Sequence, residues 1–271
     1  MDAIIKTWNK IYEGHQLLAI TGALTGVLFF FSTAIMAVDD RMLMGVNVWI
    51  KPMKFALSGM IYNWTIALLL PLYTISKRQR HNLGNILAIS MSVELLIIFI
   101  QASRGELSHY NTSTPLNGIL FGIMGLGIAI ISLISIYLCI ISFKQKLNTE
   151  PAIAWSIRFA WLAVVLSFYG GQMMISNMGH NVGVPDGGAG LPVVNWSTEG
   201  GDLRAMHFLG LHAIQILPLL TLLVGKIKYF EKNNRLMYFT IFAAVVYFSI
   251  IIFTWWQAIN GLPFYNAMES P

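Results

Sequence analysis

Long apolar runs recur along the chain, separated by short segments that hold most of the polar and charged residues. The hydrocarbon core of a bilayer is about 30 Å thick, so a helix that crosses it needs roughly 20 apolar residues. Seven runs meet that length, and we expect one membrane-spanning helix in each of residues 17–38, 55–76, 83–103, 115–143, 151–178, 205–225 and 236–259. The pattern therefore predicts an all-α polytopic membrane protein, with residues 1–271 forming a single seven-helix transmembrane domain.

The first 16 residues have a different, amphipathic pattern. Lys6 and Lys10 lie on one face of a predicted helix. The opposite face is formed by Ile4, Ile5, Trp8, Ile11 and Tyr12. A helix with one basic face and one apolar face lies in the membrane interface, so residues 1–16 are predicted to rest on the membrane surface.

The overall composition agrees with the hydrophobic pattern. Only 11% of the 271 residues are charged and 56% are hydrophobic, whereas a soluble domain has about a quarter charged residues. The net charge of +5 would suggest a nucleic-acid partner for a soluble protein, but we expect none here. The lipid bilayer is the partner that this composition predicts.

The positions of the basic residues predict the orientation. Lysines and arginines gather at residues 77–80, 144–146 and 226–235, which all fall on the same side as Lys6 and Lys10. Cytoplasmic loops of membrane proteins carry this excess of positive charge. We therefore expect a cytoplasmic N-terminus, an outer C-terminus and an extracytoplasmic loop over residues 179–204.

Polar side chains recur on one arc of each of three predicted spans, although such groups are costly in hydrocarbon. The span at 83–103 and its end carry Ser90, Glu94, Gln101 and Arg104. The span at 151–178 carries Arg158, Tyr169, Gln172 and Ser176. The span at 205–225 and its start carry Arg204, His207, His212 and Gln215. Each arc is expected to face the interior of the helix bundle, away from lipid.

Four histidines fall at the predicted outer end of the spans, namely His109, His180, His207 and His212. Neutral imidazole is the commonest protein ligand for metals and also binds haem iron. We interpret these histidines as ligands of haem b or of a transition metal such as zinc, copper or iron. A lone histidine in a membrane is often only a hydrogen-bonding core residue, and the clustering of four is what favours a ligand role.

Charged neighbours complete the predicted site. Arg104 and Arg204, with Gln215, are expected to bind the cofactor, because guanidinium groups pair with haem propionates. The alternative for both arginines is contact with lipid phosphates. Glu106 and Asp202 are expected to fix the imidazole tautomers, and Asp202 is also placed to cap the helix that follows it.

Glu94 and Arg158 are the most deeply placed charges of the predicted spans. A buried ion pair that fixes helix packing is the favoured interpretation. A proton relay through these side chains is the alternative, since carboxylates inside membranes often belong to such paths.

Three functions remain open at this point. The first is a haem- or metal-binding protein for electron transfer or oxidoreduction, with a quinone as a candidate partner. The second is a membrane-embedded zinc hydrolase or transferase that acts on a lipid, with an anionic lipid bound by the arginines. The third is a transporter, receptor or sensor for a small anionic ligand. The sequence has no phosphate-binding loop, no HExxH motif and no lysine in the last span for a retinal Schiff base.

Three stretches carry a resemblance to other proteins, namely "WIKPMKFALS" (49–58), "QASRGELSHYN" (101–111) and "GVPDGGAGLPVVNWSTEGGDLRAMHFLGLHAIQ" (183–215). With most of the remaining chain, they resemble an uncharacterised family of bacterial seven-span membrane proteins. The resemblance implies a multi-pass protein of the bacterial cytoplasmic membrane and brings no activity with it.

Overall fold

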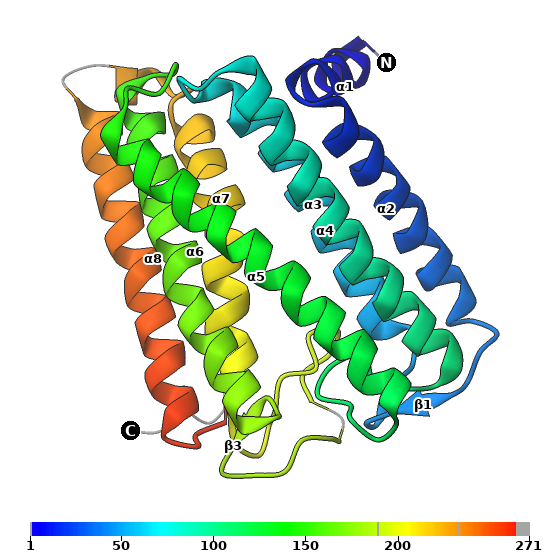
Figure 1. Ribbon diagram of the computed structural model, residues 1–271. Coiled ribbons are helices and arrows are strands. Elements are labelled where there is room, and N and C mark those ends of the chain that lie inside the picture. The colour runs from blue at the N-terminus through cyan, green and yellow to red at the C-terminus, as the bar shows by residue number, and fades with distance from the viewer. Residues whose placement is uncertain (1, 189, 232–233, 264–271) are drawn as a thin grey trace. The chain divides into compact units, whose positions relative to one another are not determined.

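The computed structural model describes residues 2–188, 190–231 and 234–263 (Figure 1). The α-helices of these residues are α1 (Asp2–Gly14), α2 (Gln16–Ile35), α3 (Ile50–Leu69), α4 (Lys77–Arg104), α5 (Pro115–Lys144), α6 (Pro151–Asn177), α7 (Leu203–Val224) and α8 (Arg235–Ile259). In this part of the chain, seven helices are long and apolar enough to cross a membrane. The predicted all-α, seven-span architecture is confirmed, and the protein is a multi-pass membrane protein.

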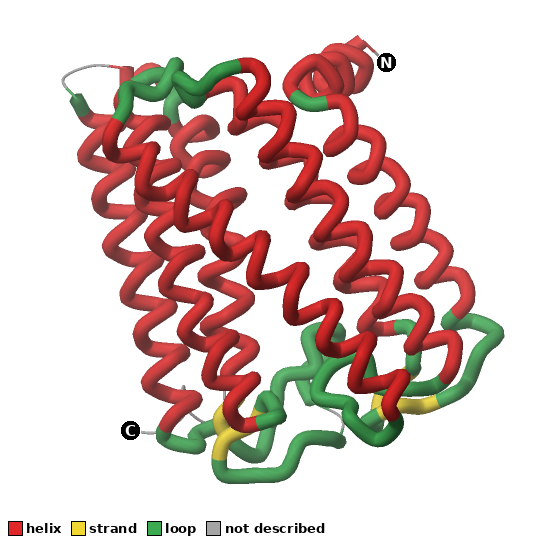
Figure 2. The backbone as a smooth tube through the Cα atoms, in the orientation of Figure 1, coloured by secondary structure: helices red, strands yellow, loops and turns green. Residues whose placement is uncertain are grey.

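Short elements join the helices, as the loops in Figure 2 show. Two 3-10 turns, η1 (Leu70–Leu72) and η2 (Lys228–Glu231), follow α3 and α7. Two antiparallel hairpins occupy loops, formed by β1 (Met42–Leu43) with β2 (Val46–Asn47) and by β3 (Asn181–Val182) with β4 (Gly201–Asp202). The hydrophobic pattern predicted neither hairpin, because strands of two residues leave no periodicity to detect.

Most helix bounds lie close to the predicted spans, but α3 and α4 each begin several residues earlier. Pro52 occupies the first turn of α3, where a missing backbone N–H costs no hydrogen bond. Before α4, the Ser76 hydroxyl accepts from the Gln79 backbone N–H, and the Gln79 side chain accepts from the Ser76 N–H. This capping box starts the helix in a polar segment that a hydropathy pattern does not include.

Tertiary contacts divide the chain into two units, residues 1–134 and residues 135–271, and α5 runs through the division. Each unit is described by itself below. The single domain expected from the sequence stays a prediction. The predicted outer C-terminus lies in residues 264–271, outside the residues that the structure describes.

In residues 1–134, the closest helix packing joins α2 to α3. A Cβ atom added at Gly22 would lie 2.4 Å from the Trp64 ring, and one at Gly26 would lie 2.9 Å from the Met60 sulfur. Two glycines four residues apart thus let large side chains of α3 press onto the α2 backbone, as in other membrane helix pairs. Figure 1 shows α1 set at a steep angle to α2, as expected of an interfacial helix.

In residues 135–271, α6 and α7 pack in a similar way. A Cβ at Gly170 would lie 2.3 Å from the Met206 sulfur, and one at Gly210 would lie 2.4 Å from the Ser167 Cβ. The third helix, α8, contacts α7 through the Tyr247 hydroxyl, which donates to the Leu209 carbonyl over 2.7 Å. Close packing of α6 and α7 fixes the positions of the polar side chains on α7.

Candidate functional site

The loop between α6 and α7 is held at its base by backbone contacts. The β3–β4 hairpin pairs Asn181 with Asp202, and the His180 carbonyl accepts from the Leu203 N–H over 3.1 Å. Gly201 lies against α8 so closely that a Cβ there would be 1.9 Å from the Ala258 carbonyl oxygen. This glycine is therefore required for a close approach of two backbones.

Asp202 begins α7 and organises the loop beside it. Its carboxylate accepts from the Arg204 backbone N–H over 2.9 Å, which is the predicted helix cap. The side chain is only 1% exposed and forms a 2.6 Å ion pair with the Arg204 guanidinium. Arg204 also donates to the Asn195 carbonyl over 2.5 Å. The contacts that the structure shows for Arg204 thus join it to the adjoining loop of the same chain. Its binding of a cofactor stays a prediction.

His180 is paired with Asp186, which the sequence interpretation did not assign to the site. The His180 Nδ1 atom lies 2.6 Å from the Asp186 carboxylate. The same carboxylate accepts from the backbone N–H groups of His180 and Asn181. Burial raises the pKa of Asp186, but these hydrogen bonds outweigh it and hold that pKa well below its usual value. The imidazole is therefore oriented by a carboxylate, an arrangement common among metal-binding histidines.

His207 is oriented by the backbone of α6. Its Nδ1 atom lies 2.8 Å from the Ser167 carbonyl oxygen. Because a carbonyl can only accept, Nδ1 carries the hydrogen and the lone pair of the ring lies on Nε2. In the part of the chain that the structure describes, the hydrogen bond to Ser167 is the only one that His207 makes. The ring rests on Gly171, where a Cβ would lie 3.0 Å from the His207 Cε1 atom.

His212 lies deeper along α7 and packs on aromatic rings. Its ring centroid is 4.3 Å from that of Phe208, which in turn is 5.9 Å from Trp196 of the loop. Gln215 interacts with the His212 side chain, and His207 lies within electrostatic range of both His180 and His212. We call His180, His207 and His212 the α7 histidine site, because all lie on or beside α7. The role of Gln215 in cofactor binding stays a prediction.

A second polar group, the α4–α5 polar network, joins the end of α4 to the start of α5. Asn117 lies at its centre, and its Oδ1 atom accepts from Gln101 and from Arg104, each over 3.0 Å. Arg104 also donates to the Gln101 carbonyl group. The Glu106 carboxylate accepts from Asn111 over 3.0 Å and from Asn117 over 3.3 Å. Arg104 and Glu106 thus stabilise the turn between two helices, and their predicted cofactor and tautomer roles remain untested.

His109 belongs to residues 1–134 and has polar and aromatic neighbours of its own. Its Nδ1 atom lies 3.1 Å from the Ser108 hydroxyl and 3.3 Å from the Lys51 ammonium group. The rings of Phe55, Tyr110 and Phe121 surround it at centroid distances of 6.0–6.3 Å. A ligand role for His109 beside the α7 histidine site stays a prediction.

Glu94 and Arg158 each have local surroundings that the sequence did not predict. Glu94 is 4% exposed, and its Oε1 atom would lie 3.2 Å from a Cβ placed on Gly127 of α5. Arg158 donates to the Ser142 carbonyl over 2.8 Å and to the Gln145 carbonyl over 3.3 Å. These are carbonyls at the C-terminal end of α5, where a cation is favourable. An ion pair between Glu94 and Arg158 stays a prediction.

Metal binding by three side chains has no support in the described residues, where no three His, Cys, Asp or Glu side chains gather closely enough to hold an ion. A zinc hydrolase needs three protein ligands and an open position. The donors that are well oriented, His180 and His207, would suit a group that takes two imidazoles or fewer from the protein.

Sequence reasoning missed Asp186, Asn117 and Lys51 as partners of the predicted residues. Asn117 left a usable signal, since an asparagine in the first turn of a predicted span needs a polar partner. Asp186 left none, because a carboxylate in a glycine-rich loop contacts His180 only through the fold of that loop.

Comparison with known proteins gives no relative: no family model, no curated protein and no solved structure matches this chain.

Proposed function

We propose that the α7 histidine site binds haem b or a transition-metal ion, and that the protein transfers electrons or catalyses an oxidoreduction at the outer face of a bacterial cytoplasmic membrane. A quinone is the partner that we propose within the bilayer. The observation that carries the proposal is the orientation of His207, whose Nδ1 donates to the Ser167 carbonyl over 2.8 Å.

This orientation favours a ligand role for a physical reason. Metal-binding histidines donate the hydrogen of one ring nitrogen to a carbonyl or carboxylate, which fixes the tautomer and makes the other nitrogen a better donor. His207 has that arrangement with a backbone carbonyl, and His180 has it with Asp186 over 2.6 Å. The two imidazoles lie within electrostatic range of one another.

Haem fits the donor set better than zinc does. A haem iron already has four ligands from the porphyrin and takes one or two from the protein, so two histidines suffice. The apolar character of α7 also suits a largely apolar cofactor. When bound, such a group would supply one-electron chemistry, while His207 and His180 would hold it and Asp186 would orient His180.

The test is an optical spectrum and a metal analysis of the purified full-length protein. We expect a Soret band that shifts on reduction, or a stoichiometric redox metal, and we expect His207→Ala to abolish it. His81→Ala is the matched control, because His81 is exposed and lies in residues 1–134. A wild-type protein with no Soret band and no stoichiometric metal would falsify the proposal.

A further inference from the structure

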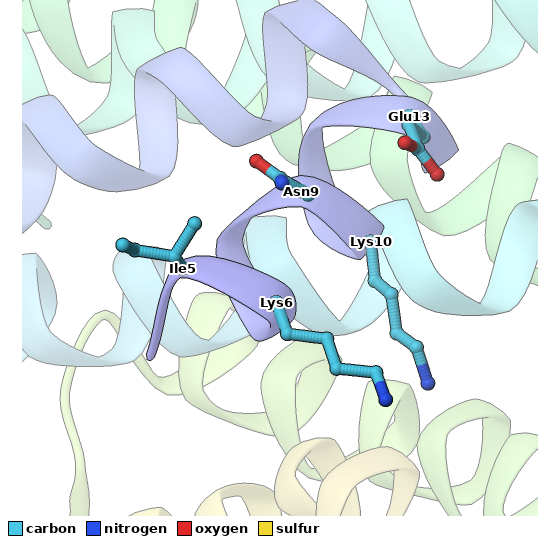
Figure 3. A pocket seen from close by; sticks show the side chains of 5 residues that line it. All are labelled: Ile5, Lys6, Asn9, Lys10 and Glu13. Atoms are coloured by element: carbon cyan, nitrogen blue, oxygen red, sulfur yellow. The ribbon is translucent and has the colours of Figure 1, made fainter. Parts of the chain in front are cut away.

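Two hollows flank α1 in residues 1–134. The smaller measures about 260 Å³ and is lined by Lys10, Glu13, Gly14, Leu68, Pro71 and Arg80. The larger measures about 440 Å³ and is lined by Ile5, Lys6, Asn9, Lys10 and Glu13 (Figure 3). Because Lys10 and Glu13 line both, the hollows form one continuous surface around α1.

The smaller hollow brings together charges from two helices. Lys10 comes from α1 and Arg80 from the first turns of α4, with Glu13 one turn beyond Lys10. Among the described residues, none of these three side chains forms an ion pair. Two cations and one anion therefore line a small space without neutralising one another, which leaves a net positive charge in it.

The guanidinium group of Arg80 gives the more specific signal. Its Nε atom is buried and has no hydrogen-bond partner within the described part of the chain. The two terminal nitrogens of Arg80 are not buried and also make no hydrogen bond within the described residues, so an acceptor from outside the protein can reach them and would stabilise the side chain. The planar guanidinium fork matches the oxygens of a phosphate group, and a nearby lysine adds a point charge.

The rest of the lining indicates that the phosphate belongs to a lipid. Leu68 and Pro71 supply an apolar wall beside the cations, which a free phosphate ion would not need. Ile4 and Ile5 of α1 are 76% and 52% exposed, as expected of an interfacial helix that places apolar side chains among acyl chains. Figure 3 shows Lys6 and Lys10 extending together from α1, while Ile5 points away from them.

From these contacts we propose that the hollow between α1, α3 and α4 binds the phosphate group of an anionic phospholipid. Arg80 and Lys10 donate to the phosphate oxygens, Leu68 and Pro71 contact the glycerol and upper acyl segment, and Lys6 adds attraction from the adjoining hollow. Glu13 opposes the bound charge and so limits the affinity. The site is separate from the α7 histidine site and does not depend on the function proposed for it.

The test uses full-length protein in a neutral maltoside detergent, with short-chain phosphatidylglycerol, diacylglycerol of the same chain length and inorganic phosphate as separate probes. Binding is read from the rise in the unfolding midpoint and from adducts in native mass spectrometry. We expect phosphatidylglycerol to bind and diacylglycerol not to bind. Inorganic phosphate that stabilises as strongly as the lipid would overturn the assignment to a lipid.

Variants locate the site. We expect Arg80→Gln and Lys10→Gln each to weaken the binding of phosphatidylglycerol about fivefold, which is the effect of one basic residue near an anionic surface. Glu13→Gln should strengthen the binding of phosphatidylglycerol.

Arg78→Gln is the matched control, because Arg78 is exposed on the same helix and lines neither hollow. Equal losses in Arg78→Gln and Arg80→Gln would show that diffuse surface charge binds the lipid, which would overturn the proposal. Helical content and the ligand-free unfolding midpoint of each variant show whether it is folded.

Discussion

The α4–α5 polar network and the α7 histidine site contain similar kinds of residue, but they use them differently. In the network, Asn117 accepts from two side chains and donates to two others, so that Gln101 and Arg104 are held by fixed partners. In the histidine site, His207 uses one ring nitrogen to fix its orientation, and the second makes no hydrogen bond among the described residues. The first arrangement is typical of structural polar groups, and the second of groups that bind something.

The difference explains why burial alone does not identify a functional residue. Gln101 and Asn117 are 0% and 1% exposed, yet their hydrogen bonds join the end of one helix to the start of the next. The useful question for each buried polar side chain is which of its atoms still lacks a partner. His207 is a stronger candidate than Arg104 or Arg204 because its one bonded nitrogen fixes the ring while the other makes no hydrogen bond among the described residues. The two guanidinium groups instead pair with side-chain oxygens of their own or the adjoining segment.

The largest expected effect comes from breaking the network. Asn117→Leu removes the two hydrogen bonds that Asn117 accepts and the two that it donates, each worth about 0.5–1.5 kcal/mol, so we expect a loss of about 2–4 kcal/mol in the free energy of unfolding. Unfolding in mixed detergent micelles measures it. Asn148→Leu, in an exposed loop position, is the control. If the two variants unfold alike, the network does not stabilise the fold.

The seven spans were predictable because apolar length is a direct physical requirement of the bilayer. The starts of α3 and α4 were predicted too late, since Pro52 and the Ser76–Gln79 capping box act through local hydrogen bonding in segments of low hydropathy. Pairing between helices was not predictable, because it depends on where single glycines such as Gly22 meet a large side chain.

A smaller loss is expected where α6 supports the histidine site. Gly171→Ala places a Cβ 3.0 Å from the His207 Cε1 atom, so the ring must move by a few tenths of an ångström. Overpacking of this kind costs about 1–3 kcal/mol, and it should also weaken any cofactor spectrum. Gly122→Ala on α5 is the matched control, since no described atom beyond its own helix lies within 4 Å of its added Cβ. If Gly171→Ala leaves both the cofactor spectrum and the unfolding midpoint unchanged, then the His207 ring can move without loss of stability or of cofactor binding.

The candidate site was predictable only in its residue types. Four histidines and two arginines near one membrane depth indicated polar groups with partners, since lipid offers none. The identity of those partners came from the fold: the loop brings Asp186 to His180, and α6 presents a backbone carbonyl to His207. A backbone carbonyl has no sequence signal, so the feature that best supports a ligand role could not be found from the residues.

Asp186 allows the support of His180 to be tested. Asp186→Asn keeps the size of the side chain but removes an oxygen that accepts from His180, so we expect a loss of about 1–2 kcal/mol. In the wild type, the pKa of Asp186 lies below its unfolded value of about 3.9. Its contribution is therefore complete above about pH 4 and decreases as the pH falls further. Unfolding midpoints from pH 6 to pH 3 should converge for the wild type and Asp186→Asn, and parallel curves would contradict this role.

The smallest effect is expected at His15, an imidazole whose two nitrogens are both used. Its Nδ1 accepts from the Leu18 backbone N–H over 3.3 Å and caps α2, and its Nε2 lies 3.1 Å from the His81 carbonyl oxygen. Burial lowers the pKa of His15, and repulsion from the His81 side chain acts in the same direction, which together outweigh the hydrogen bond to that carbonyl. This neutral, fully bonded ring is the structural counterpart of His207.

Because the pKa of His15 in the folded protein lies below the unfolded value of about 6.5, its contribution is complete above that pH and is lost as the pH falls through the folded pKa. Protonation places a hydrogen on Nδ1 and breaks the cap, so we expect a loss of about 0.5–1 kcal/mol between pH 7.5 and pH 5.5. His15→Asn keeps an acceptor at the cap without a titrating ring, and should unfold at a midpoint that changes less with pH than that of the wild type. His81→Asn retains the backbone carbonyl and should keep most of the wild-type pH dependence. Equal pH dependence in His15→Asn and the wild type would assign the effect to another group and would remove His15 as the fully bonded reference for His207.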